Sequence, residues 1–235
     1  MIRLSRLLRP TRRLRDDTSG LALLEFAFIM PITLGFILTG IEITNYVTTK
    51  MRISQIALHL ADNAARIGTG SQLEAKTITE ADINDLLTGA QYQSGSLDLF
   101  ENGRVIISSV EPMASPNTTN KFKIRWQRCK GNKLTHASSY GLAGATNIDG
   151  MGPTNRKAMA TEDGVAMFVE VYYEYEPLVK SSLSPSATMT EIASMLVRDR
   201  RDTSSDSKLS NGTNNPNPQH PDGVYKVNGV TASSC

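Results

Sequence analysis

The feature that most constrains this chain is an uncharged stretch near its N-terminus, which extends from Phe26 to Ile41. A longer, largely apolar stretch begins at Leu21 and also ends at Ile41; it has 21 residues, of which one, Glu25, is charged. An α-helix needs about 20 predominantly apolar residues to cross the hydrocarbon core of a bilayer. The sequence therefore predicts a single membrane-spanning helix, whose span we place at residues 21–46.

The charges that flank this stretch predict its orientation. Residues 1–20 contain six arginines and two aspartates, a local net charge of +4, whereas the whole chain of 235 residues has a net charge of +2. Basic residues are enriched on the cytoplasmic side of membrane spans. We therefore expect a cytoplasmic N-terminus and an outer location for the chain that follows the span.

Composition limits what the rest of the chain forms. The chain is 40% hydrophobic and 20% charged, which excludes disorder along its whole length. Its mean hydropathy is slightly negative, so it has room for one span and is not a polytopic membrane protein. The small net charge gives no sign of a nucleic-acid partner. We expect one ordinary domain with appendages.

A cleavable secretory signal does not fit the apolar stretch. Such a signal has roughly 7–15 apolar residues followed by small residues at a cleavage site. The stretch in this chain is longer and continues into the sequence Ile43-Thr44-Asn45-Tyr46. We therefore expect the span to remain in the protein.

Two residues inside the stretch are unusual for a simple anchor. Glu25 places a carboxylate at bilayer depth, which costs about 2–3 kcal/mol near the centre and less near the interface. A cut between Gly20 and Leu21 would create an α-ammonium group that could pair with this carboxylate in a neighbouring chain. Pro31 removes one helical hydrogen bond and favours a kink, which taken alone is harmless.

These residues resemble those of a known family. The heptapeptide from Gly20 to Phe26, GLALLEF, resembles a class-III prepilin processing site. Its continuation, with Pro31, Glu42 and Ala64-Ala65-Arg66, resembles the TadE/TadG-type pseudopilins of the tight-adherence (Tad/Flp) pilus system. The resemblance covers residues 18–67.

The resemblance implies a processing step and a set of partners. Residues 1–20 would be a basic leader that a prepilin peptidase removes between Gly20 and Leu21, and Glu25 and Phe26 would serve processing or assembly. The protein would be a non-enzymatic pseudopilin or minor pilin of a Tad-type (type IVc) pilus. It would act with other pilins in pilus assembly, priming or tip formation and adhesion.

The same resemblance implies a location. The protein would cross the bacterial inner membrane once, with a periplasmic C-terminal domain, and would enter the extracellular pilus after assembly. The alternative from a different class is a single-pass membrane-anchored periplasmic adaptor or sensor with an uncleaved span. An anchored hydrolase is a third and weaker hypothesis.

Helical periodicity continues beyond the membrane. Apolar residues recur at helical spacing from Ile53 to Ile67, and the sequence Gly68-Thr69-Gly70 then favours a break. We predict one helix over residues 21–67, the spine of a pilin-like fold. A coiled-coil stalk is the alternative, but no heptad repeat is sustained.

The outer domain, residues 68–200, begins with local signals of an α+β fold. Thr79 and Asp82 form a capping-box pattern before a short helix that we expect to end at Gly89. Strands at residues 97–100 and 104–107 flank Asn102-Gly103, which favours a tight hairpin.

Two further strands are predicted at residues 121–129 and 165–176. In the first, Phe122, Ile124 and Trp126 alternate with polar residues and are expected to share one face. In the second, alternate residues from Val165 to Tyr175 form one apolar face. Their outer faces have opposite charge, so we predict that they pair, with Lys123 and Arg125 opposite glutamates. Residues 191–198 fit a helix or a short edge strand. The predicted fold is α+β, with the long helix packed on a small antiparallel sheet.

Two segments of the outer region lack regular periodicity. Residues 130–164 are rich in glycine and small polar residues, without the strand, helix and lysine that a phosphate-binding loop needs, so we expect a long surface loop. Residues 201–235 have a composition that cannot bury a core. We expect a flexible C-terminal tail, unless its end is tied down.

The two cysteines are Cys129 and Cys235. Outside the inner membrane an even number of cysteines suggests a disulfide, which would join the tail to the sheet. Closing so long a loop contributes about 4 kcal/mol in the chain-entropy account. Two free thiols and an intermolecular bond are the alternatives.

The sequence offers no convincing catalytic or metal site. His59, His136 and His220 are too far apart in sequence for a metal-ligand spacing. A nucleophilic pair of Cys129 and His136 would need spatial proximity and an oxyanion motif, and the sequence contains no such motif. We therefore expect no enzyme activity, no metal and no cofactor.

Overall fold

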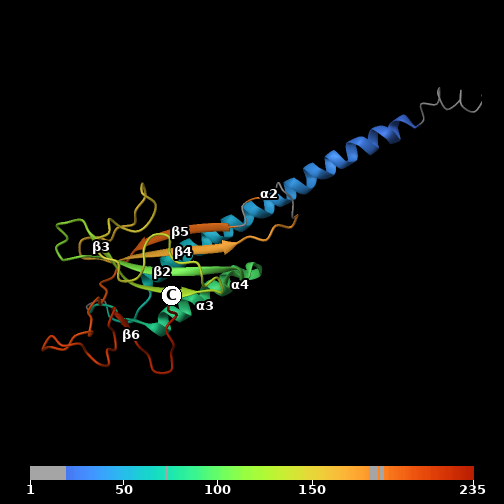
Figure 1. The fold of residues 1–235 in the computed structure, drawn as a ribbon. Coiled ribbons are helices and arrows are strands. Elements are labelled where there is room, and N and C mark those ends of the chain that lie inside the picture. The colour runs from blue at the N-terminus through green and yellow to red at the C-terminus, as the bar shows by residue number, and fades with distance from the viewer. Residues whose placement is uncertain (1–19, 72–73, 180–184, 186–187) are drawn as a thin grey trace, which may run out of the picture. The chain divides into compact units, whose positions relative to one another are not determined.

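The computed structural model describes residues 20–71, 74–179, 185 and 188–235, so the basic segment 1–19 lies outside the described residues. One long helix is followed by a small antiparallel sheet, which confirms the predicted α+β class (Figure 1). The elements in chain order are α2 (Leu21–Arg66), β1 (Ile78–Thr79), α3 (Glu80–Ser94), the 3-10 helix η2 (Gly95–Leu97), α4 (Leu99–Asn102), β2 (Gly103–Pro112), β3 (Phe122–Lys130), β4 (Ala166–Glu174), β5 (Thr188–Leu196) and β6 (Val224–Tyr225).

The chain divides into two compact units, and the division falls within α2. One unit contains α2 as far as Asn45 together with the connection Pro177–Pro185. The other contains the chain from Tyr46 to Glu176 and from Ser186 to Cys235. The folded domain therefore begins inside α2, at Tyr46, because the second half of the helix is part of the domain core.

The second half of α2 contributes the apolar stripe that the periodicity predicts. Ile53, Ile56, Leu60 and Ala64 are at most 4% exposed and belong to one core cluster with α3 and the sheet. Arg66 is the last helical residue, one residue before the predicted end. Burial of this stripe, rather than helix propensity alone, stabilises the end of so long a helix.

Helix α3 begins at the predicted capping box and extends past the predicted end. Thr79 Oγ1 accepts from the Asp82 amide at 3.2 Å, and Asp82 Oδ2 accepts from the Thr79 amide at 2.9 Å. The end predicted at Gly89 is wrong, because the buried residue Ala90 continues the apolar face and the helix reaches Ser94.

The four long strands are antiparallel in the order β3-β2-β4-β5. The predicted pairing of the strands at residues 121–129 and 165–176 is wrong, because β2 lies between them. Nine of the ten residues of β2 are buried, as expected of a central strand. Lys123 lies 3.7 Å from Glu111 on β2, and Arg125 donates to the Asp222 carbonyl at 3.1 Å. Charge pairs worth a few tenths of a kcal/mol do not decide strand order against such burial.

The hairpin predicted around Asn102-Gly103 is also wrong. Residues of its first strand form η2 and α4, and Leu99 in α4 is fully buried. Gly103 is extended rather than in a turn, and a Cβ atom there would lie 2.3 Å from the carbonyl oxygen of Tyr172. Close packing between α4 and β4, and not turn geometry, is what requires this glycine.

A β-bulge interrupts the alternation predicted for β3. Ser109 pairs with Trp126, but the next residue, Val110, pairs with Ile124, so Arg125 is the extra residue. Phe122 and Ile124 therefore pack in a second cluster, whereas Trp126 packs in the cluster that contains α2. The prediction that all three share one face is wrong.

The last two long strands settle the remaining strand predictions. The apolar face predicted for residues 165–176 is confirmed, since its members from Val165 to Tyr175 all belong to the core cluster with α2. The ambiguous segment 191–198 lies mostly in β5, which pairs with β4 and forms an edge of the sheet.

The glycine-rich segment 131–164 contains no helix and so forms no helix-based phosphate site. It covers the face of the sheet opposite α2, where Met151 is fully buried. Phe122 on β3 and Ile148 in the loop exchange two backbone hydrogen bonds of 2.8 and 3.0 Å. This segment therefore protects one edge of the sheet.

The tail that the composition predicts to be flexible makes specific contacts. Strand β6 pairs in parallel with β1, with Ile78 opposite Val224. The Asp202 amide donates to the Lys76 carbonyl at 2.9 Å. A disulfide joins the C-terminal end of the tail to β3, which is the exception to flexibility that the sequence prediction allowed.

Candidate functional site

The candidate site is the N-terminal part of α2, where the predicted cleavage residues lie. Helix α2 begins at Leu21, and the Leu24 amide donates to the Gly20 carbonyl at 3.1 Å. Among the described residues, no atom other than those of Gly20 and its chain neighbours lies within 4 Å of the position that a Cβ of Gly20 would occupy. The Gly20–Leu21 bond is therefore at the start of the helix, with open space beside Gly20 in the part of the chain that the structure describes.

From Leu21 to Ile41 every residue of α2 is exposed. The large apolar side chains in this stretch are 41–76% exposed. They are Leu21, Leu23, Leu24, Phe26, Phe28, Ile29, Met30, Ile32, Leu34, Phe36, Ile37, Leu38 and Ile41. We call Leu21–Ile41 the apolar stretch. Helix α2, which contains this stretch, is the one helix of the described chain that is long and apolar enough to cross a membrane.

The polar groups of the apolar stretch are mostly satisfied within the helix. Thr33 and Thr39 donate their hydroxyls to carbonyls four residues earlier, at 3.0 and 2.8 Å. Such bonds hide a hydroxyl from an apolar environment. The helix continues through Pro31, whose missing N–H leaves the Ala27 carbonyl without its usual helical donor.

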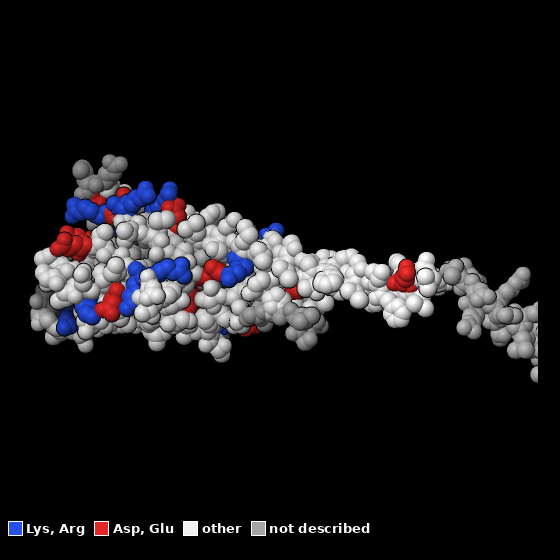
Figure 2. All heavy atoms as spheres, turned by 90° about the horizontal axis from the view of Figure 1, so that it is seen from above, with Lys and Arg blue, Asp and Glu red and all other residues white. Residues whose placement is uncertain are grey.

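Glu25 is the one charged group of the apolar stretch, and it is exposed. Figure 2 shows an acidic patch surrounded by uncharged surface next to the grey segment. Within the described chain it makes no ion pair or hydrogen bond. Phe26, the other residue predicted to serve processing or assembly, is 62% exposed beside it. The pair is exposed, and no side chain of the described residues forms an ion pair with the Glu25 carboxylate.

Glu42, the first residue after the apolar stretch, has a different environment. It is 5% exposed, and its Oε2 accepts from the Val179 amide at 3.0 Å. Both residues belong to the unit formed by the start of α2 and the connection after β4. From sequence, Glu42 stands out only as part of the pattern that resembles the pseudopilins, since a hydrogen bond across 137 residues has no local signal.

The predicted disulfide between Cys129 and Cys235 is present. The sulfur atoms are 2.04 Å apart and the Cα atoms 4.9 Å apart, which is within the usual range. The Cys129 amide also donates to the Ser233 carbonyl at 2.7 Å, and Ser233 bonds Asn84 on α3. The bridge excludes a free Cys129 nucleophile paired with His136.

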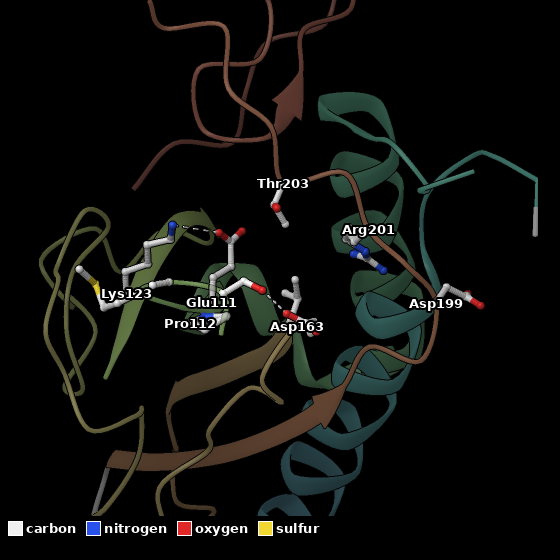
Figure 3. A pocket seen from close by; sticks show the side chains of 12 residues that line it. Glu111, Pro112, Lys123, Asp163, Asp199, Arg201 and Thr203 are labelled. Carbon is white, nitrogen blue, oxygen red and sulfur yellow. Dashed lines mark hydrogen bonds and ion pairs between the residues drawn. The ribbon is translucent and has the colours of Figure 1, made fainter. Parts of the chain in front are cut away.

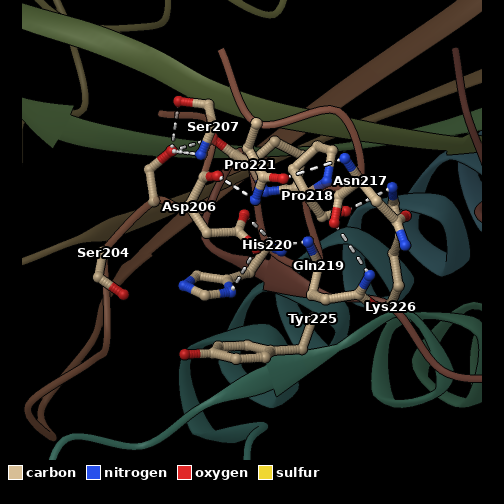
Figure 4. Close-up of polar contacts among 12 residues, drawn as sticks. Ser204, Asp206, Ser207, Asn217, Pro218, Gln219, His220, Pro221, Tyr225 and Lys226 are labelled. Atoms are coloured by element: carbon tan, nitrogen blue, oxygen red, sulfur yellow. Dashed lines mark hydrogen bonds and ion pairs between the residues drawn. The ribbon is translucent and has the colours of Figure 1, made fainter. Parts of the chain in front are cut away.

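The three histidines lie apart in the fold. His136 stacks on Tyr172 at 3.9 Å between ring centroids, and His220 stacks on Tyr225 at 4.2 Å. Figure 4 shows His220 in a tail loop arranged around Asp206, whose carboxylate accepts from the His220 amide at 2.9 Å. Among the described residues, no group of three histidine, cysteine or acidic side chains is placed to hold a metal ion.

One small polar pocket of about 270 Å³ lies beside the end of β2 (Figure 3). Its lining includes Glu111, Lys123 and Arg201. Burial raises the pKa of Glu111, and the positive charges of Arg125 and Lys123 partly offset this rise. Arg201 donates to the carbonyl of Ile67 at 3.1 Å, and burial lowers its pKa to about 10. Arg201 therefore contacts the end of α2 from the wall of this pocket.

Comparison of the chain with family models, with curated proteins and with solved structures finds no match.

Proposed function

We propose that this protein is a non-enzymatic pseudopilin or minor pilin of a Tad-type pilus, anchored by α2 in the bacterial inner membrane and processed after Gly20. The observation that carries the proposal is the contrast along α2. Every residue of the apolar stretch is exposed, whereas the stripe from Ile53 to Ala64 is buried in the domain core. Apolar surface of this extent needs lipid or other helices around it.

Exposed Glu25 supports an assembly role for the same stretch. A carboxylate in an apolar environment requires a cationic partner. Processing between Gly20 and Leu21 creates an α-ammonium group, and a neighbouring mature subunit brings this group to Glu25. The prepilin peptidase and the other pilins are the partners in this proposal. The chain after the span is then periplasmic, and it reaches the extracellular pilus on assembly.

The folded domain fits an environment outside the cytoplasm. The domain contains a disulfide. Disulfides persist in oxidising compartments and are rare in the cytosol. A compact domain at the end of an apolar helix can prime a filament, form its tip or contribute to adhesion. These roles need surfaces for protein contact and no catalytic group.

Determination of the mature N-terminus tests the proposal. N-terminal sequencing and intact-mass measurement of protein extracted from membranes are expected to find Leu21 as the first residue. A functional, membrane-extracted chain that still begins with Met1 would contradict processing. That result would favour the uncleaved adaptor or sensor.

Substitution of Glu25 tests the pairing argument. Glu25→Ala is expected to insert into the membrane normally, because it removes the one charge of the apolar stretch, but to lose processing or incorporation into filaments. Thr39→Ala, which also changes a polar exposed residue of the stretch, is the matched control and is expected to behave as wild type. Normal incorporation of Glu25→Ala would refute the pairing.

A further inference from the structure

The connection after β4 is attached to α2 at the outer end of the apolar stretch. The Val179 amide donates to Glu42 Oε2 at 3.0 Å, and Glu42 is almost completely buried. Both residues lie in the same compact unit. The hydrogen bond therefore holds the chain at Val179 at the level of Glu42 along the helix.

The length of the apolar stretch gives the depth of this contact. Its 21 residues extend about 31 Å at about 1.5 Å per residue, close to the roughly 30 Å of a bilayer hydrocarbon core. Glu42 directly follows Ile41, so it lies at the boundary between hydrocarbon and headgroups when the stretch spans a membrane. Val179 lies at that same boundary because it is bonded to Glu42.

Leu178 directly precedes Val179 and is 64% exposed. Its exposure equals or exceeds that of lipid-facing candidates on the helix such as Ile41, at 49%, and Leu38, at 41%. Insertion of a leucine side chain from headgroup depth into the acyl region is favourable because it removes apolar surface from water, as in other interfacial proteins. The bond from Val179 also keeps the Glu42 carboxylate paired, so a charge at this depth does not face lipid.

We propose that the chain at Leu178 and Val179 is a second, shallow membrane contact, in which Leu178 inserts at the interface beside α2 and Glu42 sets its depth. The ligand of this surface is a lipid bilayer. The proposal rests on the proposed membrane insertion of α2, which the experiment below measures separately.

Depth-dependent quenching tests the proposal on the full chain. Leu178→Cys is labelled with the fluorophore NBD under non-reducing conditions, where the Cys129–Cys235 disulfide leaves the new thiol as the one reactive group. The labelled protein is reconstituted in vesicles of phosphatidylcholine and phosphatidylglycerol that contain lipids with a doxyl quencher at a shallow or a deep acyl position. We expect stronger quenching by the shallow probe.

Two matched variants calibrate the measurement. Phe28→Cys, 69% exposed within the apolar stretch, is expected to be quenched more by the deep probe. Leu134→Cys, 73% exposed in the glycine-rich loop, is expected to show no quenching. Glu42→Leu removes the acceptor for the Val179 amide, so it is expected to reduce quenching at position 178 without changing it at position 28.

The outcomes separate the two proposals. Quenching at position 28 without quenching at position 178 overturns the shallow contact and leaves the span intact. Absence of quenching at position 28 overturns the span and the shallow contact with it. Unchanged quenching at position 178 in the Glu42→Leu background overturns the role of Glu42 in setting depth.

Discussion

Gly103 occupies a position where two backbone segments leave no room for a side chain. A Cβ atom there would lie 2.3 Å from the Tyr172 carbonyl oxygen and 2.8 Å from the Leu99 carbonyl oxygen. Gly103→Ala is therefore expected to lower the free energy of unfolding by about 1–3 kcal/mol through overpacking. Chemical denaturation of the detergent-solubilised chain, monitored by circular dichroism, measures the change.

Gly89 is the matched control for this substitution. It lies inside α3, and nothing lies within 4 Å of the position of its missing Cβ. Gly89→Ala should raise the free energy of unfolding by about 0.5–1 kcal/mol, because alanine loses less backbone entropy in a helix. Equal effects of the two substitutions would refute the packing argument for Gly103.

Glu111 gives the domain a predictable response to pH. Burial raises the pKa of its carboxyl above the ordinary value of 4.5, with Arg125 and Lys123 opposing. A raised pKa means that the folded state binds the proton more tightly than the unfolded state. Its contribution to stability is therefore complete below pH 4.5 and is lost as the pH rises through the pKa of the folded state.

Glu111→Gln is expected to remove this loss. The variant should be more stable than wild type at about pH 8 and equally stable at about pH 4, since glutamine resembles the protonated carboxyl. Unfolding curves of both proteins at the two pH values measure the difference. A variant that is less stable than wild type at the higher pH would show that the Lys123 contact outweighs the cost of burial.

The end of α2 shows how an element depends on a distant residue. The last carbonyls of a helix have no intrahelical donor. Arg201 supplies donors to the Ala65 carbonyl at 3.2 Å and the Ile67 carbonyl at 3.1 Å. Its positive charge also suits the C-terminal end of the helix dipole. The Gly68-Thr69-Gly70 sequence predicted where the helix ends, but not that an arginine 135 residues beyond Arg66 completes it.

Removal of this arginine should destabilise the helix end. Arg201→Met is expected to cost about 1–3 kcal/mol, because hydrogen bonds from a charged donor are lost in a partly buried setting. It should also speed hydrogen exchange of amides in the last turn of α2. Arg52→Met, at an exposed position of the same helix, should change neither quantity. Unaltered exchange in Arg201→Met would contradict the capping role.

At the scale of the whole molecule, the disulfide fixes the C-terminal end of the tail to β3. It joins residues 106 positions apart. Reduction, or Cys235→Ser, is expected to lower the free energy of unfolding by up to about 4 kcal/mol in the chain-entropy account. Limited proteolysis should then cut residues 201–235 faster, although β6 and its pairing with β1 remain.

The two ways of breaking the bridge provide their own control. A reducing agent should destabilise wild type but have no effect on Cys235→Ser. If wild type unfolds identically with and without the bridge, the ordered tail depends on its non-covalent contacts alone. Those contacts include Arg128, which donates to Asp222 at 3.0 Å and is also paired with Glu80.

The sequence by itself determined the features that depend on neighbouring residues. The long helix, its buried stripe and the alternation along β4 follow the period of one element, and the capping box at Thr79 involves residues three positions apart. All of them can therefore be recognised without knowledge of the fold. The apolar stretch and the unusual place of Glu25 are local in the same sense. Together they were sufficient for the α+β class and for a candidate site.

Only the tertiary structure decided what depends on residues far apart in the chain. The insertion of β2 between β3 and β4, the bulge that turns Trp126 toward α2, and the bonds of Glu42 and Arg201 have no periodic signal. Strand order follows from which strand buries both faces, and that quantity exists only after the chain has packed. The free energy of long-range contacts depends on how all segments pack together. A sequence pattern indicates only which local structure and which degree of burial each segment favours.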